Sequence, residues 1–231
     1  MPLPRLFAAA ALLVFAPTAA LSAPPKRAPA PVLPAPVLVV ATPQGSHLVG
    51  RPGAPLKLVE YVSYTCAHCA AFEKEGADTL SLTLIRPGKA SLEYRPFLRN
   101  IVDVAATLMV GCGTPGRFPG NHAAVLRAQE KWLVPPSEAA QQRWQTGDFP
   151  TRMRAVAQDM NLYALFEARG YARAELDRCL ANEKLADAIA AENRQAIATL
   201  KIGGTPSFLI NGKLQSAHDW ATLRTALAAA Q

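Results

Sequence analysis

The order of its predicted strands and helices limits this 231-residue chain to a fold whose sheet is built from two separated parts. Residues 56–62 (LKLVEYV) and 91–97 (SLEYRPF) are rich in strand-forming residues and flank a helical stretch, which predicts a β-α-β unit. From residue 102 to about 199, strand signals nearly vanish and apolar residues recur at helical spacing. A short strand over 207–210, a hairpin and a terminal helix follow. The sequence therefore predicts an α/β fold that a helical insertion interrupts.

We expect five segments along the chain. They are a signal peptide over residues 1–22, a Pro/Ala-rich linker over 23–45, the first part of the α/β domain over 46–101, a helical insertion over 102–184 and the second part of the α/β domain over 185–231. The two outer parts together form one split domain.

The N-terminus has the composition of an export signal. Arg5 precedes an apolar run over residues 6–15, and small residues that suit a signal peptidase follow. Cleavage after residue 20 or 22 fits best, and an uncleaved anchor is the alternative, although the apolar run is short for one. Residues 23–45 are rich in Pro and Ala and lack acidic residues, which favours an extended spacer. We therefore expect an exported, periplasmic domain.

The charge of the chain argues only weakly for a nucleic-acid partner, and we expect none. The formal net charge is +7, but residues 46–231 carry 21 Lys and Arg against 17 Asp and Glu, which leaves +4. No cluster of basic residues alternates with aromatic residues. Beyond the first 23 residues no stretch of about 18 or more positions is apolar, which excludes an integral membrane bundle.

A pair of cysteines directly follows the first predicted strand, in the run Cys66-Ala67-His68-Cys69. Cysteines three positions apart at a helix N-terminus can form a disulfide, and the first thiolate faces unpaired backbone N–H groups and the positive end of the helix dipole. In such motifs the pKa of the first thiol falls from about 8.5 to between about 3.5 and 7.5. We therefore expect Cys66 to be the exposed, acidic nucleophile and Cys69 the buried, resolving thiol, with His68 adding a positive charge or a hydrogen bond.

Two other interpretations of this motif have less support. A zinc site would need a second Cys-x-x-Cys or Cys-x-His pair, and neither Cys112 nor Cys179 belongs to one, so we expect no metal and no cofactor. A purely structural disulfide is disfavoured because so small a loop constrains little of the unfolded chain.

Two further motifs are residues 204–212 (GTPSFLING) and residues 59–61 (VEY) ahead of SYTC. The first resembles the cis-proline loop and hairpin of the thioredoxin superfamily, and the second resembles the approach strand of its DsbA-like thiol:disulfide oxidoreductases. The resemblance covers residues 46–231 in element order and implies a thioredoxin fold interrupted by a helical insertion, with dithiol-disulfide exchange at the paired cysteines. Ala67 departs from the pattern, because DsbA-like oxidants commonly carry proline there, and this leaves oxidation versus isomerisation open.

The same resemblance assigns Thr205 and Pro206 to client binding. A cis bond between them would turn the Thr205 backbone toward the disulfide, where it can pair with an extended client chain. A trans proline that opens a strand is the alternative.

Two glutamates are candidates for moving protons at the active site. Glu60 lies six residues before Cys66 on an otherwise apolar strand, and we expect it beneath the active site, where it would shuttle protons to Cys69. An exposed strand carboxylate is the alternative. In DsbA-like relatives a glutamate at the place of Glu60 lies near the buried cysteine, and another, one turn into the helix, matches Glu73.

The remaining cysteines, Cys112 and Cys179, both fall in the predicted insertion. With the CAHC cysteines paired locally, a 112–179 disulfide is the pairing left, and it would close a loop of 67 residues in an exported protein. Two free thiols are the alternative. Some DsbA-like proteins carry a second, non-catalytic disulfide here, so the resemblance favours a structural bridge. His122, in a Gly-Asn-His run, and His218, just before a helix cap, are predicted to be ordinary surface residues.

Two classes of function remain. The first is a periplasmic oxidoreductase that introduces disulfides into unfolded or reduced exported polypeptides and is re-oxidised by a membrane thiol oxidase, with an isomerase or reductase as the alternative. The second is a peptide-binding chaperone module whose cysteines are redox-inert or serve as a copper or zinc clamp. Isomerase relatives are dimers built through an added N-terminal domain, and residues 24–45 are too short to be one, so we expect a monomeric oxidase.

Overall fold

The structure is a computed structural model in which residues 37–230 are described. The predicted signal peptide and the first part of the predicted linker, up to residue 36, lie outside the described residues. Among the described residues, no helix combines the length and the apolar character needed to cross a bilayer.

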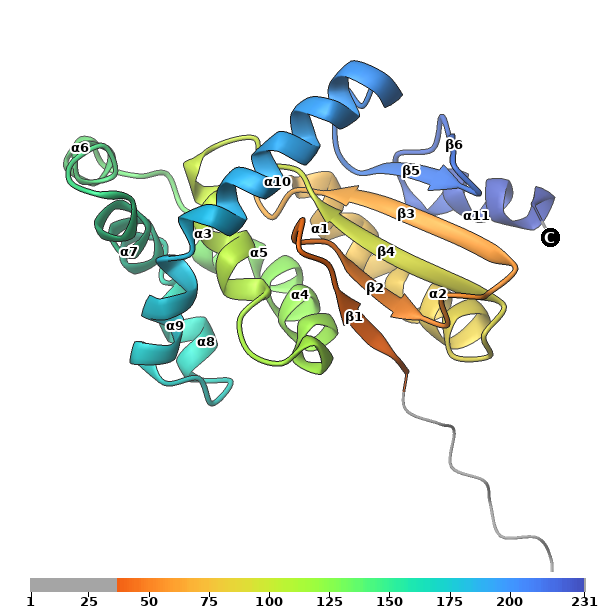
Figure 1. The fold of residues 1–231 in the computed structure, drawn as a ribbon, viewed down its shortest axis with the longest axis horizontal. Helices are drawn as coiled ribbons and strands as arrows, with labels where there is room; N and C mark the ends of the chain where they lie inside the picture. Colours follow the sequence, from red (N-terminus) through yellow and green to blue (C-terminus); the bar gives the residue numbers. More distant parts are fainter. Residues whose placement is uncertain (1–36, 231) are drawn as a thin grey trace, which may run out of the picture. The chain divides into compact units, whose positions relative to one another are not determined.

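The centre of the structure is a sheet of six strands: β1 (Val39–Ala41), β2 (His47–Gly50), β3 (Leu56–Val62), β4 (Ala90–Pro96), β5 (Ser207–Ile210) and β6 (Lys213–Leu214). Their order in the sheet is β1-β2-β4-β3-β5-β6 (Figure 1). The β3 strand is parallel to β4 and antiparallel to β5, with Leu58 opposite Ile210 and Tyr61 opposite Ser207. A strand from near the end of the chain therefore completes the sheet beside the first predicted β-α-β unit.

The β1 strand lies inside residues 23–45, which the composition assigned to an extended linker. Val39 pairs with Val49 and Ala41 pairs with His47, so this part of the predicted linker is an edge of the sheet. The Val-Leu-Val-Val run over residues 37–40 explains the difference, because β-branched residues favour a strand and the prolines lie on either side of the run.

The helices that cover the sheet are α1 (Ala67–Glu75), α2 (Ala77–Leu80), the π-helical turn η1 (Ser81–Ile85), α10 (Glu183–Gln195), the π-helical turn η3 (Ala196–Leu200) and α11 (Trp220–Ala229). On one face, Leu58 of β3 packs in one cluster with Phe72 of α1 and Leu223 of α11. On the other face, Tyr61 packs with Ala196 of η3. Because neighbouring residues of a strand point to opposite faces, Glu60 shares the face of Leu58, beneath α1.

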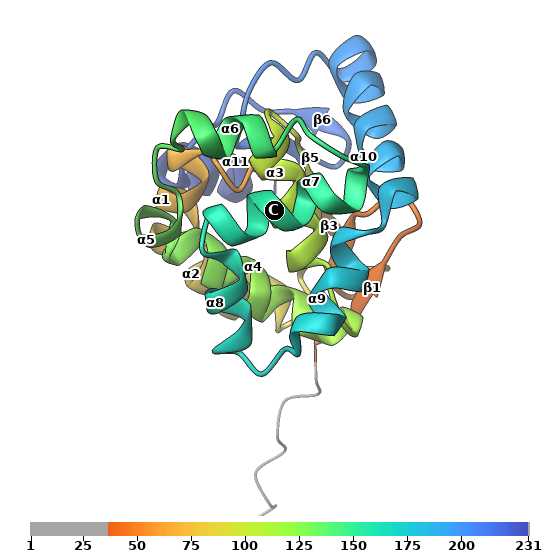
Figure 2. The same ribbon diagram turned by 90° about the vertical axis from the view of Figure 1, so that its left-hand side faces the viewer.

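The predicted insertion is a layer of helices: α3 (Ile101–Val110), the short 3-10 turn η2 (Pro115–Arg117), α4 (Phe118–Arg127), α5 (Gln129–Trp132), α6 (Glu138–Arg143), α7 (Phe149–Asp159), α8 (Leu162–Glu167) and α9 (Arg173–Leu180). In Figure 2 these helices face the viewer, with α7 and α8 in front. Their apolar core is continuous with Val62, Cys66 and Cys69, so the largest core cluster extends from the cysteine pair into the insertion. The exact division of the domain at residues 102 and 184 stays a prediction.

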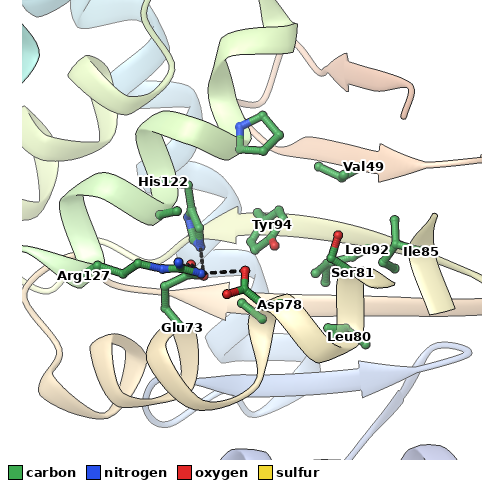
Figure 3. A pocket seen from close by; sticks show the side chains of 13 residues that line it. Val49, Glu73, Asp78, Leu80, Ser81, Ile85, Leu92, Tyr94, His122 and Arg127 are labelled. Carbon is green, nitrogen blue, oxygen red and sulfur yellow. Dashed lines mark hydrogen bonds and ion pairs between the residues drawn. The ribbon is translucent and has the colours of Figure 1, made fainter. Parts of the chain in front are cut away.

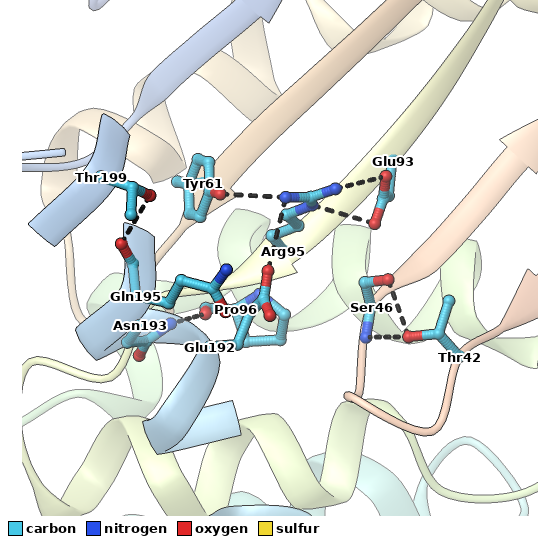
Figure 4. Close-up of polar contacts among 10 residues, drawn as sticks. All are labelled: Thr42, Ser46, Tyr61, Glu93, Arg95, Pro96, Glu192, Asn193, Gln195 and Thr199. Atoms are coloured by element: carbon cyan, nitrogen blue, oxygen red, sulfur yellow. Dashed lines mark hydrogen bonds and ion pairs between the residues drawn. The ribbon is translucent and has the colours of Figure 1, made fainter. Parts of the chain in front are cut away.

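Polar contacts attach α10 to the carboxyl end of β4 (Figure 4). The Arg95 guanidinium donates to the Tyr61 hydroxyl at 3.1 Å and pairs with Glu192 of α10 at 3.4 Å. Asn193, which is buried, donates to the carbonyl of Pro96 at 2.7 Å and accepts from the N–H of Leu98 at 2.7 Å. One amide side chain therefore satisfies two backbone groups where the chain leaves the sheet.

Cys112 and Cys179 are joined by a disulfide, with their Cα atoms 5.7 Å apart. Cys112 follows the end of α3, and Cys179 lies in the last turn of α9. Cys112 is 2% exposed, and its carbonyl accepts a hydrogen bond from the Tyr171 hydroxyl at 2.9 Å. The bridge therefore ties the first and last helices of the α3–α9 layer together inside its core.

Candidate active site

The cysteine pair lies where β3 ends and α1 begins. Cys66 is the N-cap residue of α1, has an extended backbone conformation (φ −93°, ψ 118°) and makes no side-chain capping hydrogen bond. Because an N-cap residue precedes the first unpaired N–H groups of the helix, the Cys66 sulfur faces the backbone N–H groups of His68 and Cys69. Both cysteines are free thiols.

The two thiols differ less in exposure than the sequence suggests. Cys69 is fully buried, as expected, but Cys66 is only 4% exposed, so the prediction of an exposed Cys66 is wrong for the residue as a whole. The loop before β5 accounts for the difference, because the Cys66 thiol donates to the carbonyl of Thr205 at 3.1 Å. This loop comes from 139 positions further along the chain, so no local pattern around Cys66 could reveal it.

The surroundings of Cys66 favour its thiolate. A hydrogen bond from the Cys69 thiol is the largest influence that lowers the pKa of Cys66, which falls to about 4. The Thr205 side chain and the backbone N–H groups of His68 and Cys69 lower it further, and burial acts in the opposite direction. The Thr205 hydroxyl has no other hydrogen-bond partner among residues 37–230, so it is available to the thiolate.

Cys69 has the opposite character. Burial is the main reason that the pKa of Cys69 lies well above the ordinary thiol value, and the hydrogen bond to Cys66 and the charge of Glu60 raise it further. A thiolate on Cys66 and a neutral thiol on Cys69 are therefore the favoured protonation states of the reduced pair.

Glu60 is buried beneath the pair, in the position that the sequence predicts. It is 1% exposed and lies between Tyr94 of β4 and Phe208 of β5 in the sheet register. Neither carboxylate oxygen has a hydrogen-bond partner among the described residues. Burial, and then the nearby charge of Glu73, hold the pKa of Glu60 well above its usual range, so this carboxyl group is neutral at moderate pH.

Glu73 lies on α1 and lines a cavity of about 130 Å³ that also contacts α2, β2, β4 and α4 (Figure 3). Arg127 of α4 donates to Glu73 at 2.9 Å and bridges to Asp78 at 2.8 Å. Burial raises the pKa of Glu73 to about 7, although Arg127 opposes this shift. Glu73 can therefore exchange a proton near neutral pH while it lines a cavity.

His122 is 2% exposed, so the prediction that it is a surface residue is wrong. The Gly-Asn-His run lies inside α4, whose first turn carries Pro119, and the helix turns the imidazole inward. Its Nδ1 lies 3.1 Å from the Tyr64 hydroxyl, and its Nε2 lies 3.6 Å from Glu73. Burial lowers the pKa of His122 to about 3, so the ring is neutral at moderate pH.

Arg127 and His47 also belong to this region and were not predicted. His47 of β2 stacks on Phe118 with ring centroids 3.8 Å apart, and burial lowers the pKa of His47 to about 4. Helical spacing could have placed Arg127 one turn beyond Ala123, but nothing local links it to Glu73, which lies 54 positions earlier.

The Thr205–Pro206 peptide bond is cis, and it lies next to the cysteine pair. A groove of about 750 Å³ runs beside it and is lined by His68, Lys201, Leu214 and His218, among others. His218 is exposed, as predicted, but its Nδ1 lies 2.8 Å from the Pro206 carbonyl oxygen. The structure thus brings together Cys66, Cys69, His68, Glu60 and the Thr205–Pro206 loop, whereas Cys112 and Cys179 lie apart in the helical layer.

A sheet with this order, a Cys-x-x-Cys pair at the start of α1 and a cis-proline loop facing it define a thioredoxin-like domain. The family described as thioredoxin matches residues 42–229, and the chain belongs to this family. The predicted thioredoxin fold with a helical insertion is confirmed.

Known structures and curated relatives are consistent with this family. A protein-disulfide isomerase from Novosphingobium aromaticivorans is 46% identical, with a TM-score of 0.76, and the match covers 80% of this chain and 96% of that one. Wolbachia pipientis alpha-DsbA1 is 20% identical with a TM-score of 0.63, over 79% of this chain and 88% of that one, which shows a shared fold. A putative protein-disulfide oxidoreductase from Rickettsia bellii is 25% identical over 73% of this chain, and the match spans 58% of that relative.

Proposed function

We propose that the protein is a thiol:disulfide oxidoreductase that introduces disulfide bonds into exported polypeptides. The observation that carries the proposal is the position of Cys66, at the N-terminus of α1, against buried Cys69 and within 3.1 Å of the Thr205 carbonyl. The relatives named as protein-disulfide oxidoreductases and as a protein-disulfide isomerase support the same chemistry.

The exchange would proceed through a mixed disulfide. A client thiolate attacks the Cys66 sulfur of the oxidised pair, which breaks the Cys66–Cys69 bond and releases Cys69 as a thiolate that gains a proton. A second client thiolate then attacks the client sulfur of the mixed disulfide. This step forms the client disulfide and releases the Cys66 thiolate, so the client loses two electrons and the pair gains them. A low pKa makes Cys66 a good leaving group, which favours oxidation of the client.

Glu60 would supply the proton that Cys69 takes up. It is buried on the face of β3 that α1 covers, its raised pKa favours the protonated form, and it lies close enough to Cys69 for the two groups to interact when Glu60 is ionised. Glu73 would then return a proton to Glu60 from the cavity that it lines. The two carboxyl groups together would allow a fully buried thiol to exchange protons with solvent.

Clients would bind in the groove beside the Thr205–Pro206 loop. The loop presents backbone groups next to Cys66, and these can pair with many extended sequences. His68, which lines the groove and is exposed, would contact the client close to the reacting sulfur atoms.

Location, partners and assembly complete the proposal. The apolar N-terminal run supports export to the periplasm, and an oxidase there requires a membrane thiol oxidase that returns the pair to the disulfide. We propose that the protein acts as a monomer, and that the Cys112–Cys179 bridge is structural.

Isomerisation is the second candidate, because the 46% identical relative is named a protein-disulfide isomerase and the chain carries Ala67 between the cysteines. Oxidation of a reduced client and reactivation of a scrambled client, measured on one protein together with the reduction potential of the 66/69 pair, separate the two. Oxidation of the reduced client at a higher rate than reactivation of the scrambled client, together with a strongly oxidising reduction potential, supports the oxidase.

The control for both assays is Cys66→Ser, which should abolish exchange, whereas the double variant Cys112→Ala/Cys179→Ala should retain it. Full activity in Cys66→Ser would contradict the role of Cys66, whereas wild-type protein that exchanges no disulfides would favour a redox-inert peptide-binding module.

A further inference from the structure

The loop between β3 and α1 is held by a buried carboxylate of the helical layer. Asp103 of α3 is fully buried, and its oxygens accept hydrogen bonds from the Ser63 hydroxyl at 2.9 Å and 3.0 Å. They also accept from the backbone N–H and the hydroxyl of Thr65, both at 3.0 Å, and from the N–H of Arg99 at 2.9 Å. The carboxylate therefore fixes two of the three residues that precede Cys66.

A second residue of the helical layer holds the same loop through its carbonyl groups. Gln129 of α5 is buried, and its Nε2 donates to the carbonyl of Tyr64 at 2.8 Å and to that of Cys66 at 3.0 Å. Asp103 thus binds donors of the loop, and Gln129 binds acceptors. Figure 1 shows α3 beyond the carboxyl ends of β3 and β4, where this loop begins.

These contacts fix the backbone that leads into Cys66 and α1. Cys66 makes no side-chain capping hydrogen bond among the described residues, so the backbone conformation of the loop, together with the contact between the thiol and the Thr205 carbonyl, keeps the sulfur against the N–H groups of His68 and Cys69. We propose that Asp103 and Gln129 are positioning residues through which the helical layer sets the reactivity of Cys66. This inference rests on the proposed redox function. It gives the helical layer a role that the cysteine and cis-proline motifs alone do not indicate.

Asp103→Asn separates a positioning role from a simple effect of charge, because the two predict opposite changes in the pKa of Cys66. Removing a negative charge near a thiolate lowers the pKa of Cys66. Releasing the loop raises it, because the thiolate loses aligned N–H donors. Gln129→Met removes two hydrogen bonds without changing any charge, so only the second effect applies to that variant.

The test is a pH titration of thiolate absorbance in the reduced, folded variants, together with the equilibrium of the 66/69 pair against glutathione. We expect the pKa of Cys66 to rise by about one unit in Asp103→Asn and in Gln129→Met, which is a tenfold change in the thiolate equilibrium. We also expect a less oxidising pair in both variants.

The matched control is Asp159→Asn in α7, which removes a carboxylate of the same layer that accepts from Trp144 at 2.9 Å and pairs with Arg143 at 2.7 Å. It should lower the stability of the protein and leave the pKa of Cys66 unchanged. An unchanged or lower pKa of Cys66 in folded Gln129→Met would overturn the inference, even if Asp103→Asn fails to fold. Wild-type protein that exchanges no disulfides would instead overturn the proposed function.

Discussion

Glu60 places in the core a carboxyl group that has no hydrogen-bond partner among residues 37–230, and this has a consequence for stability that depends on pH. Its pKa is raised by burial, so the folded protein keeps a proton that the unfolded chain releases above about pH 4.3. The unfavourable contribution of Glu60 therefore grows as the pH rises above that value. The same burial that would let Glu60 act as the proposed proton donor makes it costly to ionise.

Glu60→Gln should raise the free energy of unfolding by about 1–3 kcal/mol at about pH 8 and change it little at about pH 4, because the amide never ionises. Urea unfolding at the two pH values measures the difference. Glu75→Gln, at an exposed position of α1, is the control and should change the free energy of unfolding by less than about 0.5 kcal/mol. An equal effect of Glu60→Gln at both pH values would argue against a protonated Glu60 in the folded protein.

Cys69 acts on Cys66 before any client arrives. A hydrogen bond from its thiol is the largest influence that lowers the pKa of Cys66 to about 4, so Cys69→Ala should move the thiolate transition toward the ordinary value. Thiolate absorbance against pH measures the shift, and Cys66→Ala should remove the low-pH transition altogether. A transition near pH 4 that persists in Cys66→Ala would show that the acidic thiol has been misassigned.

Among the elements, α3 and α9 depend on their covalent link. The Cys112–Cys179 bridge closes a loop of 67 residues, for which the loop-entropy relation gives about 4 kcal/mol. Cys112→Ala/Cys179→Ala should lower the stability by up to this amount, measured by urea unfolding, with thiolate titration of Cys66 unchanged. A large change in that titration would instead link the bridge to the redox site.

The segment where the chain leaves β4 depends on contacts with α10. Asn193→Ala would leave the buried carbonyl of Pro96 and the N–H of Leu98 without their partner, at a cost of about 2 kcal/mol or more. Gln195→Ala, at an exposed position of the same helix, is the control and should change the stability by less than about 0.5 kcal/mol. Equal unfolding midpoints for the two variants would contradict the role of Asn193.

The elements that sequence could predict are those with a local signal. The 56–62 strand has such a signal, and the position of Glu60, six residues before Cys66 on an otherwise apolar strand, together with the DsbA-like resemblance, predicted its place beneath the site. The β1 strand was missed because a short valine-rich run stands among prolines. His122 was missed because its Gly-Asn neighbours suggest a loop, although α4 contains all three residues.

The rest of the site depends on contacts between distant positions. Asp103 lies 40 positions from Ser63, and Gln129 lies 63 positions from Cys66, so neither partner can be identified from periodicity or motif spacing. Such residues look like ordinary members of helices until the helical layer is placed against the sheet.

For the molecule as a whole, the buried histidines and the buried glutamates together predict that the free energy of unfolding is greatest in mildly acidic solution. Burial lowers the pKa of His47 to about 4 and that of His122 to about 3. The contribution of each histidine to the free energy of unfolding therefore decreases as the pH falls below about 6.5. Burial raises the pKa of Glu73 to about 7 and also raises that of Glu60. The contribution of each glutamate to the free energy of unfolding therefore decreases as the pH rises above about 4.3.

On the acid side of the stability maximum, His47→Phe should therefore reduce the slope of the free energy of unfolding against pH by up to about 1.4 kcal/mol per pH unit. On the alkaline side it should leave the slope unchanged. Phenylalanine preserves the stacking on Phe118, so packing changes little. Thermal or urea unfolding at a series of pH values measures the slopes. An acid side that stays equally steep would mean that His47 is not a neutral buried residue in the fold.

The contact between Cys66 and Thr205 also has a consequence for the order of events during synthesis. Because 139 positions separate the two residues, a chain made from its N-terminus carries Cys66 long before the loop that contacts its thiol exists. During that interval the growing chain has neither the groove nor the β5 strand that completes the sheet beside β3. A newly made copy therefore has Cys66 uncovered first, and the contact that covers this thiol forms only when the segment from Lys201 onward has folded against the rest.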